Sequence, residues 1–354
     1  MADNVRQLTT LLVFSLVIVG APAARAAQTI VAHDHYVEST SDPSIKLFVR
    51  EKYASDAPSS TGKAVLFVHG SYAPGGHFDL PVPGYSFLSF LAANGYAAYT
   101  MDIRGYGYSS RPAADGHGGD NPIGHKPHAL ADIGDVVAFI RRRTDVARID
   151  LVGFSHGTYR VGYFAAAHPE LVRKIVMLGG TWISPNRRAI ERLKEAGDGV
   201  RLAARHREAY RVIPAGAPRM WDRLIQEDDK TRYRDARTVS AMADYLGGSD
   251  RDWRANGNLG YRAPNGATHD FFKIARGVFD YDPSMVLTPT LVINGSWDIS
   301  TFGAWHLYRR LGAPYKRLIS ISRGTHFIHL EYVAPQVHRE VLLWLSEEIP
   351  RQRP

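Results

Sequence analysis

The sequence predicts an α/β fold in which a mostly parallel, twisted sheet of about eight strands carries helices on both faces. Short, continuous apolar runs, which are typical of strands buried on both faces, alternate with amphipathic helical patterns. This alternation favours right-handed crossovers between parallel strands. The chain has 354 residues, 45% of them hydrophobic, and can therefore supply the core of one large domain with an insertion, or of two domains.

The first residues have the pattern of an export signal. Arg6 lies in a short polar start, residues 11–19 are almost wholly apolar, and Ala-Arg-Ala at 24–26 offers a small-x-small cleavage site. The apolar run is too short to span a bilayer. We therefore expect residues 1–26 to be a cleaved signal peptide and the mature chain to be periplasmic or secreted, without stable membrane insertion. An uncleaved membrane anchor is the alternative.

Composition excludes several classes of function. The net charge is +8, but Lys and Arg are scattered rather than clustered with aromatic residues, so we expect no nucleic-acid partner. The chain has no cysteine, which excludes a thiol nucleophile and any Cys-ligated metal.

The elements of the core are expected at 27–180 and 287–354, on either side of an insertion at 181–286. The first part begins with an antiparallel hairpin over 28–52, turning at 41–44, and a surface loop at 54–62. We predict further strands at 64–68, 96–101, 174–178, 289–294 and 317–322, and helices at 86–94, 129–143 and 335–349. Another strand is expected where the apolar residues Ile149, Leu151 and Val152 lead into Gly153. The insertion is rich in Arg, Asp, Ala and Trp, and it shows helical stretches and no convincing buried strand. It is expected to form a helical lid over the carboxyl edge of the sheet.

The pentapeptide Gly153-Phe154-Ser155-His156-Gly157 joins a predicted strand to a predicted helix. A G-x-S-x-G motif in this setting is typical of a nucleophile held in a strained turn, where two glycines let strand and helix approach. Ser155 would project at the carboxyl edge of the sheet, at a helix N-terminus that favours developing negative charge. An ordinary tight turn is the alternative.

A second loop, His69-Gly70-Ser71-Tyr72, follows the strand at 64–68. His-Gly at this place matches a loop that donates one oxyanion N–H, and the expected donor is the backbone of Ser71. A plain glycine turn, with His69 bonded to the backbone, is the alternative. The glycines at 105 and 107 do not complete a dinucleotide-binding motif, and no helix follows them.

A serine hydroxyl needs a base within reach and a carboxylate that orients the base. Asp298 and His326 each lie just past a predicted strand, so parallel strands would bring them to the edge that carries Ser155. His329 competes for the role of base, and Asp298 could instead cap the helix that follows it. Glu331 could orient the loop of His326 or be a solvated surface residue.

Other histidines do not form a recognisable metal site. His117, His125 and His128 share no helical spacing and have no nearby carboxylate pattern, and the same holds for the triplet at 33–35. We interpret residues 111–128 as a rim loop and predict neither a metal nor a cofactor.

Taken together, His69-Gly70, Gly153–Gly157, Asp298 and His326 resemble the α/β-hydrolase superfamily. The subgroup that the chain resembles most has a lid between strands six and seven and includes many esterases. The resemblance covers nearly all of the mature chain outside the lid, and it implies that His156 supplies the second oxyanion N–H. Related epoxide and haloalkane hydrolases carry Asp as nucleophile, whereas this chain has Ser155, which argues against those two reactions.

The implied activity is hydrolysis of a carboxylic ester, with a small-molecule substrate. Amide or carbon–carbon bond hydrolysis with the same residues is an alternative, and a ligand-binding protein with a vestigial site is another. Tyr72, Trp182 and Trp221 are candidate pocket residues, and Trp253, Phe271, Phe272 and Phe279 could join them. Arg219, Arg223 and Arg254 suggest an acidic or phenolic substrate. A peptidase would need a lid carboxylate, for which Glu227, Asp228 and Asp229 are candidates.

Overall fold

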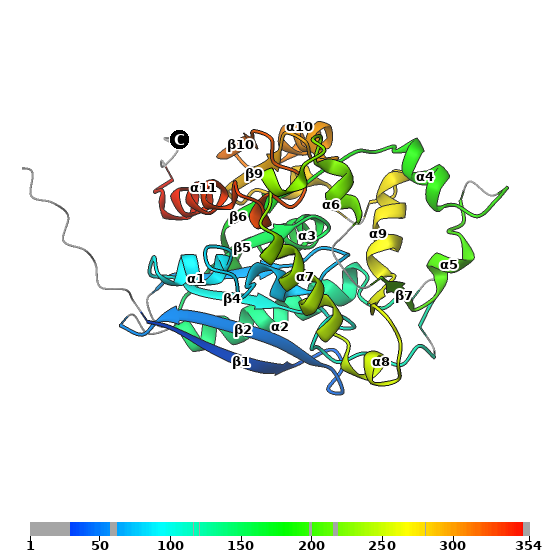
Figure 1. The fold of residues 1–354 in the computed structure, drawn as a ribbon, viewed down its shortest axis with the longest axis horizontal. Coiled ribbons are helices and arrows are strands. Elements are labelled where there is room, and N and C mark those ends of the chain that lie inside the picture. The colour runs from blue at the N-terminus through cyan, green and yellow to red at the C-terminus, as the bar shows by residue number, and fades with distance from the viewer. Residues whose placement is uncertain are drawn as a thin grey trace, which may run out of the picture.

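The computed structural model describes residues 29–56, 62–115, 117–119, 121–197, 200–214, 219–279 and 281–349. Its centre is an eight-stranded sheet in the order β1-β2-β4-β3-β5-β6-β9-β10 (Figure 1). Strand β2 runs antiparallel to both of its neighbours, and all the other neighbours are parallel. The strands are β1 (Ile30–Glu38), β2 (Lys46–Ala54), β3 (Ala64–Val68), β4 (Ala97–Met101), β5 (Ile149–Phe154), β6 (Val172–Leu178), β9 (Thr290–Gly295) and β10 (Lys316–Ile321). The predicted mostly parallel sheet is thus confirmed.

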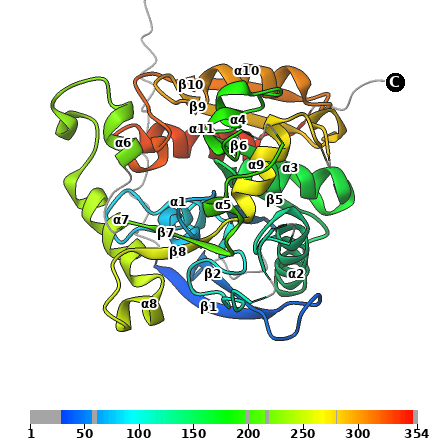
Figure 2. The same cartoon turned by 90° about the vertical axis from the view of Figure 1, so that its right-hand side faces the viewer.

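Continuous apolar runs form the central strands because both of their faces are covered. Every residue of β3, β4, β5 and β9 is buried. On one side of the sheet α1 packs against α11, and on the other α2 packs against α3 (Figure 2). The helices of this core are α1 (Phe87–Ala92), α2 (Lys126–Thr144), α3 (Gly157–Ala167), α10 (Thr301–Arg310) and α11 (Ala334–Ser346).

Residues 179–289 connect β6 to β9 and are called the β6–β9 connection. Its helices α4, α5 and α9 lie beyond one end of the sheet strands, on the right of Figure 1 and toward the viewer in Figure 2. The elements are α4 (Arg187–Leu193), α5 (Ala204–Arg207), β7 (Tyr210–Ile213), α6 (Arg219–Leu224), α7 (Ala236–Gly248), α8 (Arg251–Ala255), β8 (Tyr261–Pro264) and α9 (Gly266–Ala275).

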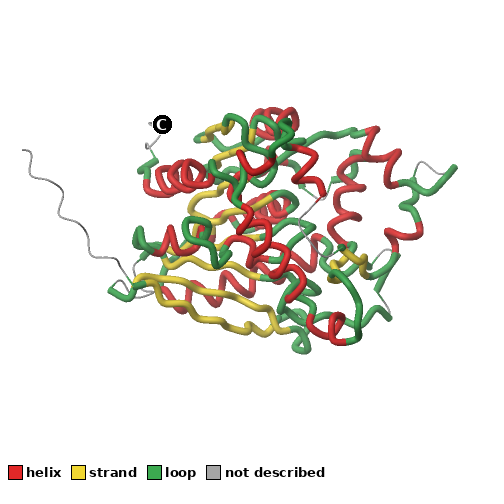
Figure 3. Tube along the Cα trace, in the orientation of Figure 1, coloured by secondary structure: helices red, strands yellow, loops and turns green. Residues whose placement is uncertain are grey.

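The sequence shows no convincing buried strand in this connection, but the structure has two short strands there. β7 and β8 pair antiparallel as a separate two-stranded sheet, which is visible among helices and loops in Figure 3. Each of these strands has four residues, and each carries an arginine, Arg211 or Arg262. A run this short and this polar shows too little alternation to be recognised as a strand. The boundaries of the predicted lid, 181–286, remain a prediction.

Two expectations concern residues that the structure does not describe. The predicted signal peptide at 1–26 lies outside the described residues, as do residues 57–61 of the predicted surface loop. Within the described ranges, no helix combines the length and the hydropathy that a membrane span requires.

Candidate active site

The turn between β5 and α3 holds Ser155 in a left-handed backbone conformation, with φ of +54°. This conformation is strained for a residue with a side chain and is often found where function requires it. A side chain on Gly157 would collide with the carbonyl oxygen of Val68, and a Cβ on Gly153 would lie 2.5 Å from the Gly157 oxygen. The two glycines therefore let the strand and the helix approach, as the motif predicts.

The loop that follows β3 lies directly against Ser155. A Cβ on Gly70 would lie 2.9 Å from the Ser155 Cβ, so only glycine fits at this position. His69 shapes the loop: its Nδ1 lies 2.7 Å from the Gly70 oxygen, and its Nε2 lies 3.1 Å from the Ile103 nitrogen, which donates to it. Burial, reinforced by the charge of Arg160, holds the pKa of His69 well below its usual value. His69 is thus a neutral residue with a structural role.

Arg160, on α3, fixes the orientation of the peptide between Gly70 and Ser71. Its Nη1 donates to the carbonyl oxygens of His69 and Gly70, at 2.9 and 3.2 Å. In a trans peptide the C=O and the following N–H point in opposite directions. By holding the Gly70 carbonyl, Arg160 therefore turns the Ser71 N–H away from itself. Within the described chain, the N–H groups of Ser71 and His156 bond to no other protein group.

Asp298 and His326 are in direct contact. The Nδ1 of His326 lies 3.0 Å from both carboxylate oxygens of Asp298. The N–H of Ser300, the residue that precedes α10, also donates to Asp298, at 2.9 Å, in the turn before the helix, and no side chain caps α10 at its N-cap, Ser300. Burial alone would raise the pKa of the Asp298 carboxyl, but His326 and the bonds from Ser300 outweigh it and lower the pKa below its usual value. Asp298 is therefore a carboxylate that faces a histidine.

Ser155 and His326 line one cavity of about 640 Å³, together with Ser71 and His156. The Ser155 hydroxyl and the His326 ring do not meet hydrogen-bond criteria within the described chain. Catalytic hydrogen bonds are often long in a site without substrate and shorten when the complex forms. The structure thus brings Ser155, His326 and Asp298 to one edge of the sheet.

The competing histidine, His329, lies elsewhere. Its Nε2 is 2.9 Å from the Nδ1 of His77, and both rings are buried beside Phe154. It contacts neither Ser155 nor Asp298 through a hydrogen bond in the described chain. Of the two histidines, His326 is therefore the candidate base for Ser155.

Glu331 ties the loop before His326 to the β6–β9 connection. One carboxylate oxygen accepts from the Nε1 of Trp221, at 2.8 Å, and from the Thr325 hydroxyl, while the other accepts from the Thr325 N–H at 3.0 Å. Glu331 is only 2% exposed. It is therefore no solvated surface residue, and it anchors the residue that precedes His326.

The β6–β9 connection supplies most of the wall of the cavity. The wall contains apolar Ile183, Leu193, Met220 and Phe271, the aromatic Tyr159, and three arginines, Arg192, Arg205 and Arg211. No Asp or Glu is among its lining residues in the described chain. The remaining lining residues are Gly179, Thr181, Asn186, His206, Ala267, Thr268, Ile299 and Ser300.

The candidate pocket residues from the sequence do not form this wall, apart from Phe271. Tyr72 packs against Tyr261, Trp182 stacks between Tyr159 and Phe279, and Trp221 is bonded to Glu331. Trp182 and Trp221 are buried behind the wall because large aromatic residues also fill cores. The other residues that the sequence suggested, Arg219, Arg223, Arg254, Trp253, Phe272, Phe279, Glu227, Asp228 and Asp229, are not among the lining residues either.

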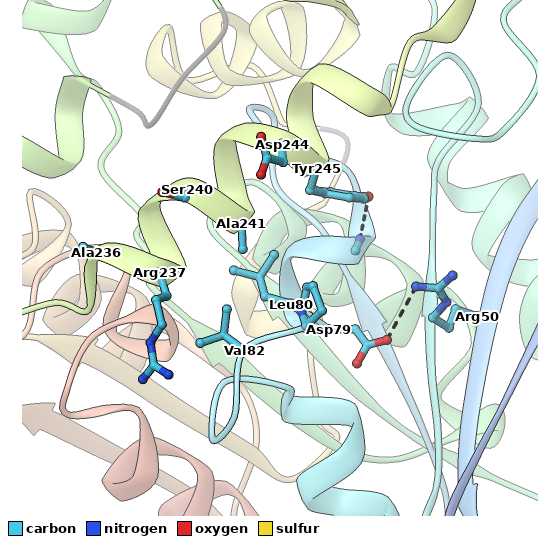
Figure 4. Close-up of a pocket in the computed structure, with 12 residues that line it drawn as sticks. Arg50, Asp79, Leu80, Val82, Ala236, Arg237, Ser240, Ala241, Asp244 and Tyr245 are labelled. Carbon is cyan, nitrogen blue, oxygen red and sulfur yellow. Dashed lines mark hydrogen bonds and ion pairs between the residues drawn. The ribbon is translucent and has the colours of Figure 1, made fainter.

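A second cavity, also of about 640 Å³, lies between α7 and the loop after β3 (Figure 4). It contains Arg50, Asp79, Asp244 and Tyr245 but no residue of the Ser155 site. Figure 4 shows Arg50 reaching toward Asp79, which it approaches to 3.6 Å, and the Tyr245 hydroxyl accepting from the Gly76 N–H at 2.7 Å. Nothing in this cavity resembles a nucleophile paired with a base.

The predicted rim histidines gather without forming a metal site. The Nδ1 atoms of His125 and His128 are 3.2 Å apart, and the His117 ring lies 6.3 Å from that of His128. In the described residues, no group of three or more His, Cys, Asp or Glu side chains is arranged to hold a metal ion.

Comparison with known proteins places this arrangement in a family. Residues 63–332 match the model of the alpha/beta hydrolase fold. The chain belongs to this family. The match spans the first buried strand, the serine turn, Asp298 and His326, so these parts of the site come from the shared fold.

Individual relatives match only part of the chain. The chain is 30% identical over 125 residues to epoxide hydrolase 2 of Siraitia grosvenorii, which covers 34% of each chain. It is 30% identical over 119 residues to a serine hydrolase-like protein of Danio rerio, covering 34% of this chain and 31% of the relative. The chain thus spans about a third of the length of these relatives. Among solved structures, E-2-(acetamidomethylene)succinate hydrolase is similar, with a TM-score of 0.57 and 19% identity over 88% of this chain and 98% of that one, which shows the fold alone.

Proposed function

We propose that this protein is a serine hydrolase that cleaves a carboxylic ester through an acyl-enzyme. The observation that carries the proposal is the shared cavity: Ser155, in a left-handed turn, faces the same space as His326, whose other side is bonded to Asp298. A hydroxyl, an imidazole and a carboxylate in this arrangement are the components of an activated serine.

In the first step, His326 accepts the proton of Ser155 while the serine oxygen attacks the carbonyl carbon. Asp298 holds the ring so that its Nδ1–H points to the carboxylate, and it stabilises the imidazolium that forms. The N–H groups of Ser71 and His156 bind the oxyanion, an effect worth about 3 kcal/mol per donor. His326 then protonates the leaving alcohol, and water attacks the acyl-enzyme with His326 again acting as base.

Chemistry separates this proposal from epoxide hydrolysis, the activity in the name of one partial relative. If Ser155 opened an epoxide, the product would be an ether on the enzyme, which has no carbonyl for water to attack. A carboxylate nucleophile would instead form an ester that water can hydrolyse. With Ser155 in the turn, the site therefore supports acyl transfer and not epoxide opening.

Amide or carbon–carbon bond cleavage with the same three residues is the second candidate. An aminopeptidase would need a carboxylate that binds the free amine, and the described wall of the cavity has none. Glu227 pairs with Arg323 instead, at 3.1 Å. The charge of the wall thus favours other acyl substrates over peptides with a free N-terminus.

The test combines labelling with turnover. A fluorophosphonate should attach to Ser155, as peptide mass spectrometry would show, and 4-nitrophenyl acetate should give a burst of nitrophenol followed by steady release. Labelling without steady turnover would mean a binding protein with a vestigial site. No labelling of Ser155 in folded protein would refute the proposal. A panel of esters, aminoacyl amides and diketones then separates the ester, amide and carbon–carbon alternatives.

A further inference from the structure

Three arginines line the cavity of Ser155, and no Asp or Glu is among its described lining residues. Arg192 comes from α4, Arg205 from α5 and Arg211 from β7; Arg192 and Arg205 are exposed and Arg211 is half-buried, so three separate elements bring an arginine to the same space. Burying or clustering like charges without a partner is unfavourable. An anionic group on a bound molecule would remove this cost.

We propose that the substrate carries an anionic group, a carboxylate or a similar oxyanion, remote from the bond that Ser155 attacks. This inference rests on the proposed function and specifies its substrate class. Arginine is suited to such a group because its planar fork of N–H donors matches the two oxygens of a carboxylate.

The neighbouring carboxylates are already engaged with other cations. On α4, Glu191 pairs with Lys194, at 3.0 Å, and just beyond the helix Glu195 pairs with Arg207, at 3.2 Å. Arg192 and Arg205 form no ion pair in the described chain; the only side-chain bond between them runs from the Arg205 Nη2 to the Arg192 carbonyl, at 3.3 Å. Both guanidinium groups are therefore available to a ligand.

Arg211 extends this positive wall to the oxyanion loop. Its Nη1 bonds to the Pro264 carbonyl and to Asn265, and its Nη2 bonds to the carbonyl oxygen of Ser71. All of these acceptors are neutral, so the charge of Arg211 is held in place without being cancelled. Asp270, a buried acid of α9, lies 3.6 Å from the His156 ring and forms no ion pair with the three arginines in the described chain.

The experiment measures discrimination between matched esters. The mono-4-nitrophenyl esters of butanedioic, pentanedioic and hexanedioic acid carry a free carboxylate at the far end, and the corresponding esters with a terminal carboxamide have nearly the same shape without the charge. The Ser155→Ala enzyme serves as the blank for spontaneous hydrolysis. We expect kcat/KM for at least one chain length to be about tenfold or more higher for the carboxylate than for the carboxamide.

The effect of each arginine is measured on the ratio of kcat/KM for the carboxylate ester to kcat/KM for the carboxamide ester. A general loss of activity lowers both values equally and cancels in this ratio. Arg192→Gln and Arg205→Gln should each lower the carboxylate-to-carboxamide ratio several-fold, and the double variant should bring it close to one, an effect of about tenfold. Arg223→Gln, an exposed arginine on α6 outside the wall, is the matched control and should keep the wild-type ratio. High salt should reduce the wild-type ratio because these charges are partly exposed.

Equal kcat/KM for the charged and neutral esters at every chain length would overturn the inference, and so would a wild-type ratio in the double variant. Hydrolysis of 4-nitrophenyl acetate and labelling of Ser155 report on the proposed function separately. If both succeed and the ratio is one, only the anionic substrate is wrong. If both fail, the proposed function itself is wrong.

Discussion

The two cavities have the same volume, about 640 Å³ each, but they differ in how their charges are satisfied. In the cavity of Figure 4, Arg50 is bonded to Asp34, at 2.7 and 2.8 Å, and also lies near Asp79, which pairs with Lys52 at 2.6 Å. In the cavity of Ser155, the arginines have no acidic partner in the described chain, and a buried tyrosine hydroxyl is unpartnered.

This difference indicates that charged and polar groups without a partner in the protein identify a functional cavity better than its volume does. Pairing polar groups stabilises a surface hollow, as it does for Arg50, Asp79 and Tyr245 of the second cavity, whereas a binding site keeps part of its bonding capacity for a ligand. The comparison makes four predictions, which follow from the largest expected effect to the smallest.

The largest effect is expected when the Ser155 hydroxyl is removed, and removal of the Ser240 hydroxyl in the second cavity is the control. Ser155→Ala should lower kcat for an activated ester by about a thousandfold or more, because no other described group can form the acyl-enzyme. Ser240→Ala, at an exposed serine of the second cavity, should leave kcat unchanged. Initial rates and thermal melting of both variants provide the measurement. Near-normal turnover by well-folded Ser155→Ala would refute the mechanism.

Removing the charge of a carboxylate should likewise lower activity at the Ser155 site and not in the second cavity. Asp298→Asn should lower kcat by about a thousandfold, because the amide cannot stabilise the imidazolium and favours the wrong tautomer of His326. Since the lowered pKa of Asp298 keeps its carboxyl ionised at neutral and alkaline pH, the loss should persist across that range. Asp244→Asn, an exposed acid of the second cavity, is the control and should be fully active. A comparable loss in both variants would contradict the assignment.

Removing the hydroxyls of Tyr159 and Tyr245 should have different effects on the free energy of unfolding. Tyr159→Phe removes a buried hydroxyl that has no partner in the described chain, so it should leave the free energy of unfolding unchanged or slightly higher, with little effect on kcat/KM. Tyr245→Phe leaves the Gly76 N–H without its acceptor, so it should destabilise the fold by about 1–3 kcal/mol with little effect on kcat/KM. Urea denaturation and ester kinetics measure both quantities. Destabilisation by Tyr159→Phe, with Tyr245→Phe as stable as the wild type, would contradict the distinction between the two cavities.

The smallest effect concerns pH. Burial, followed by the charges of neighbouring arginines, lowers the pKa of His206, and burial lowers the pKa of His156 despite the opposing bond from Asp270. Groups with lowered pKa values lose their proton before neutral pH is reached, so arginine supplies the positive charge of the wall above pH of about 6.5. The carboxylate-to-carboxamide ratio should therefore change by less than about twofold between pH 7 and pH 9. A steep fall of this ratio with rising pH would mean that histidines supply the positive charge of the wall.

Much of the core was predictable because its signals are local. The strand predicted at 64–68 is β3 residue for residue, and the strands predicted at 289–294 and 317–322 differ from β9 and β10 by one residue at each end. The strained turn of Ser155 follows from two glycines that flank it within five residues. The meeting of Asp298 and His326 was also predictable, since the carboxyl ends of parallel strands share one edge.

The wall of the cavity was not predictable in the same way. The sequence suggested Arg219, Arg223 and Arg254, yet the arginines at the cavity are Arg192, Arg205 and Arg211. All six lie in the β6–β9 connection, so composition indicated a basic region without distinguishing its inner side from its outer side. The same holds for Trp221, which the sequence placed at the pocket and which the structure bonds to Glu331 in the interior.

The sequence by itself determined the parallel sheet, the serine turn and the order in which the serine, the carboxylate and the histidine occur along the chain. These features depend on periodicity and on residues that are close neighbours in the chain. Only the tertiary structure decided which side chains surround the serine, because short helices and a short strand of the β6–β9 connection must first pack over the sheet. Their packing, rather than their composition, orients three arginines toward one space.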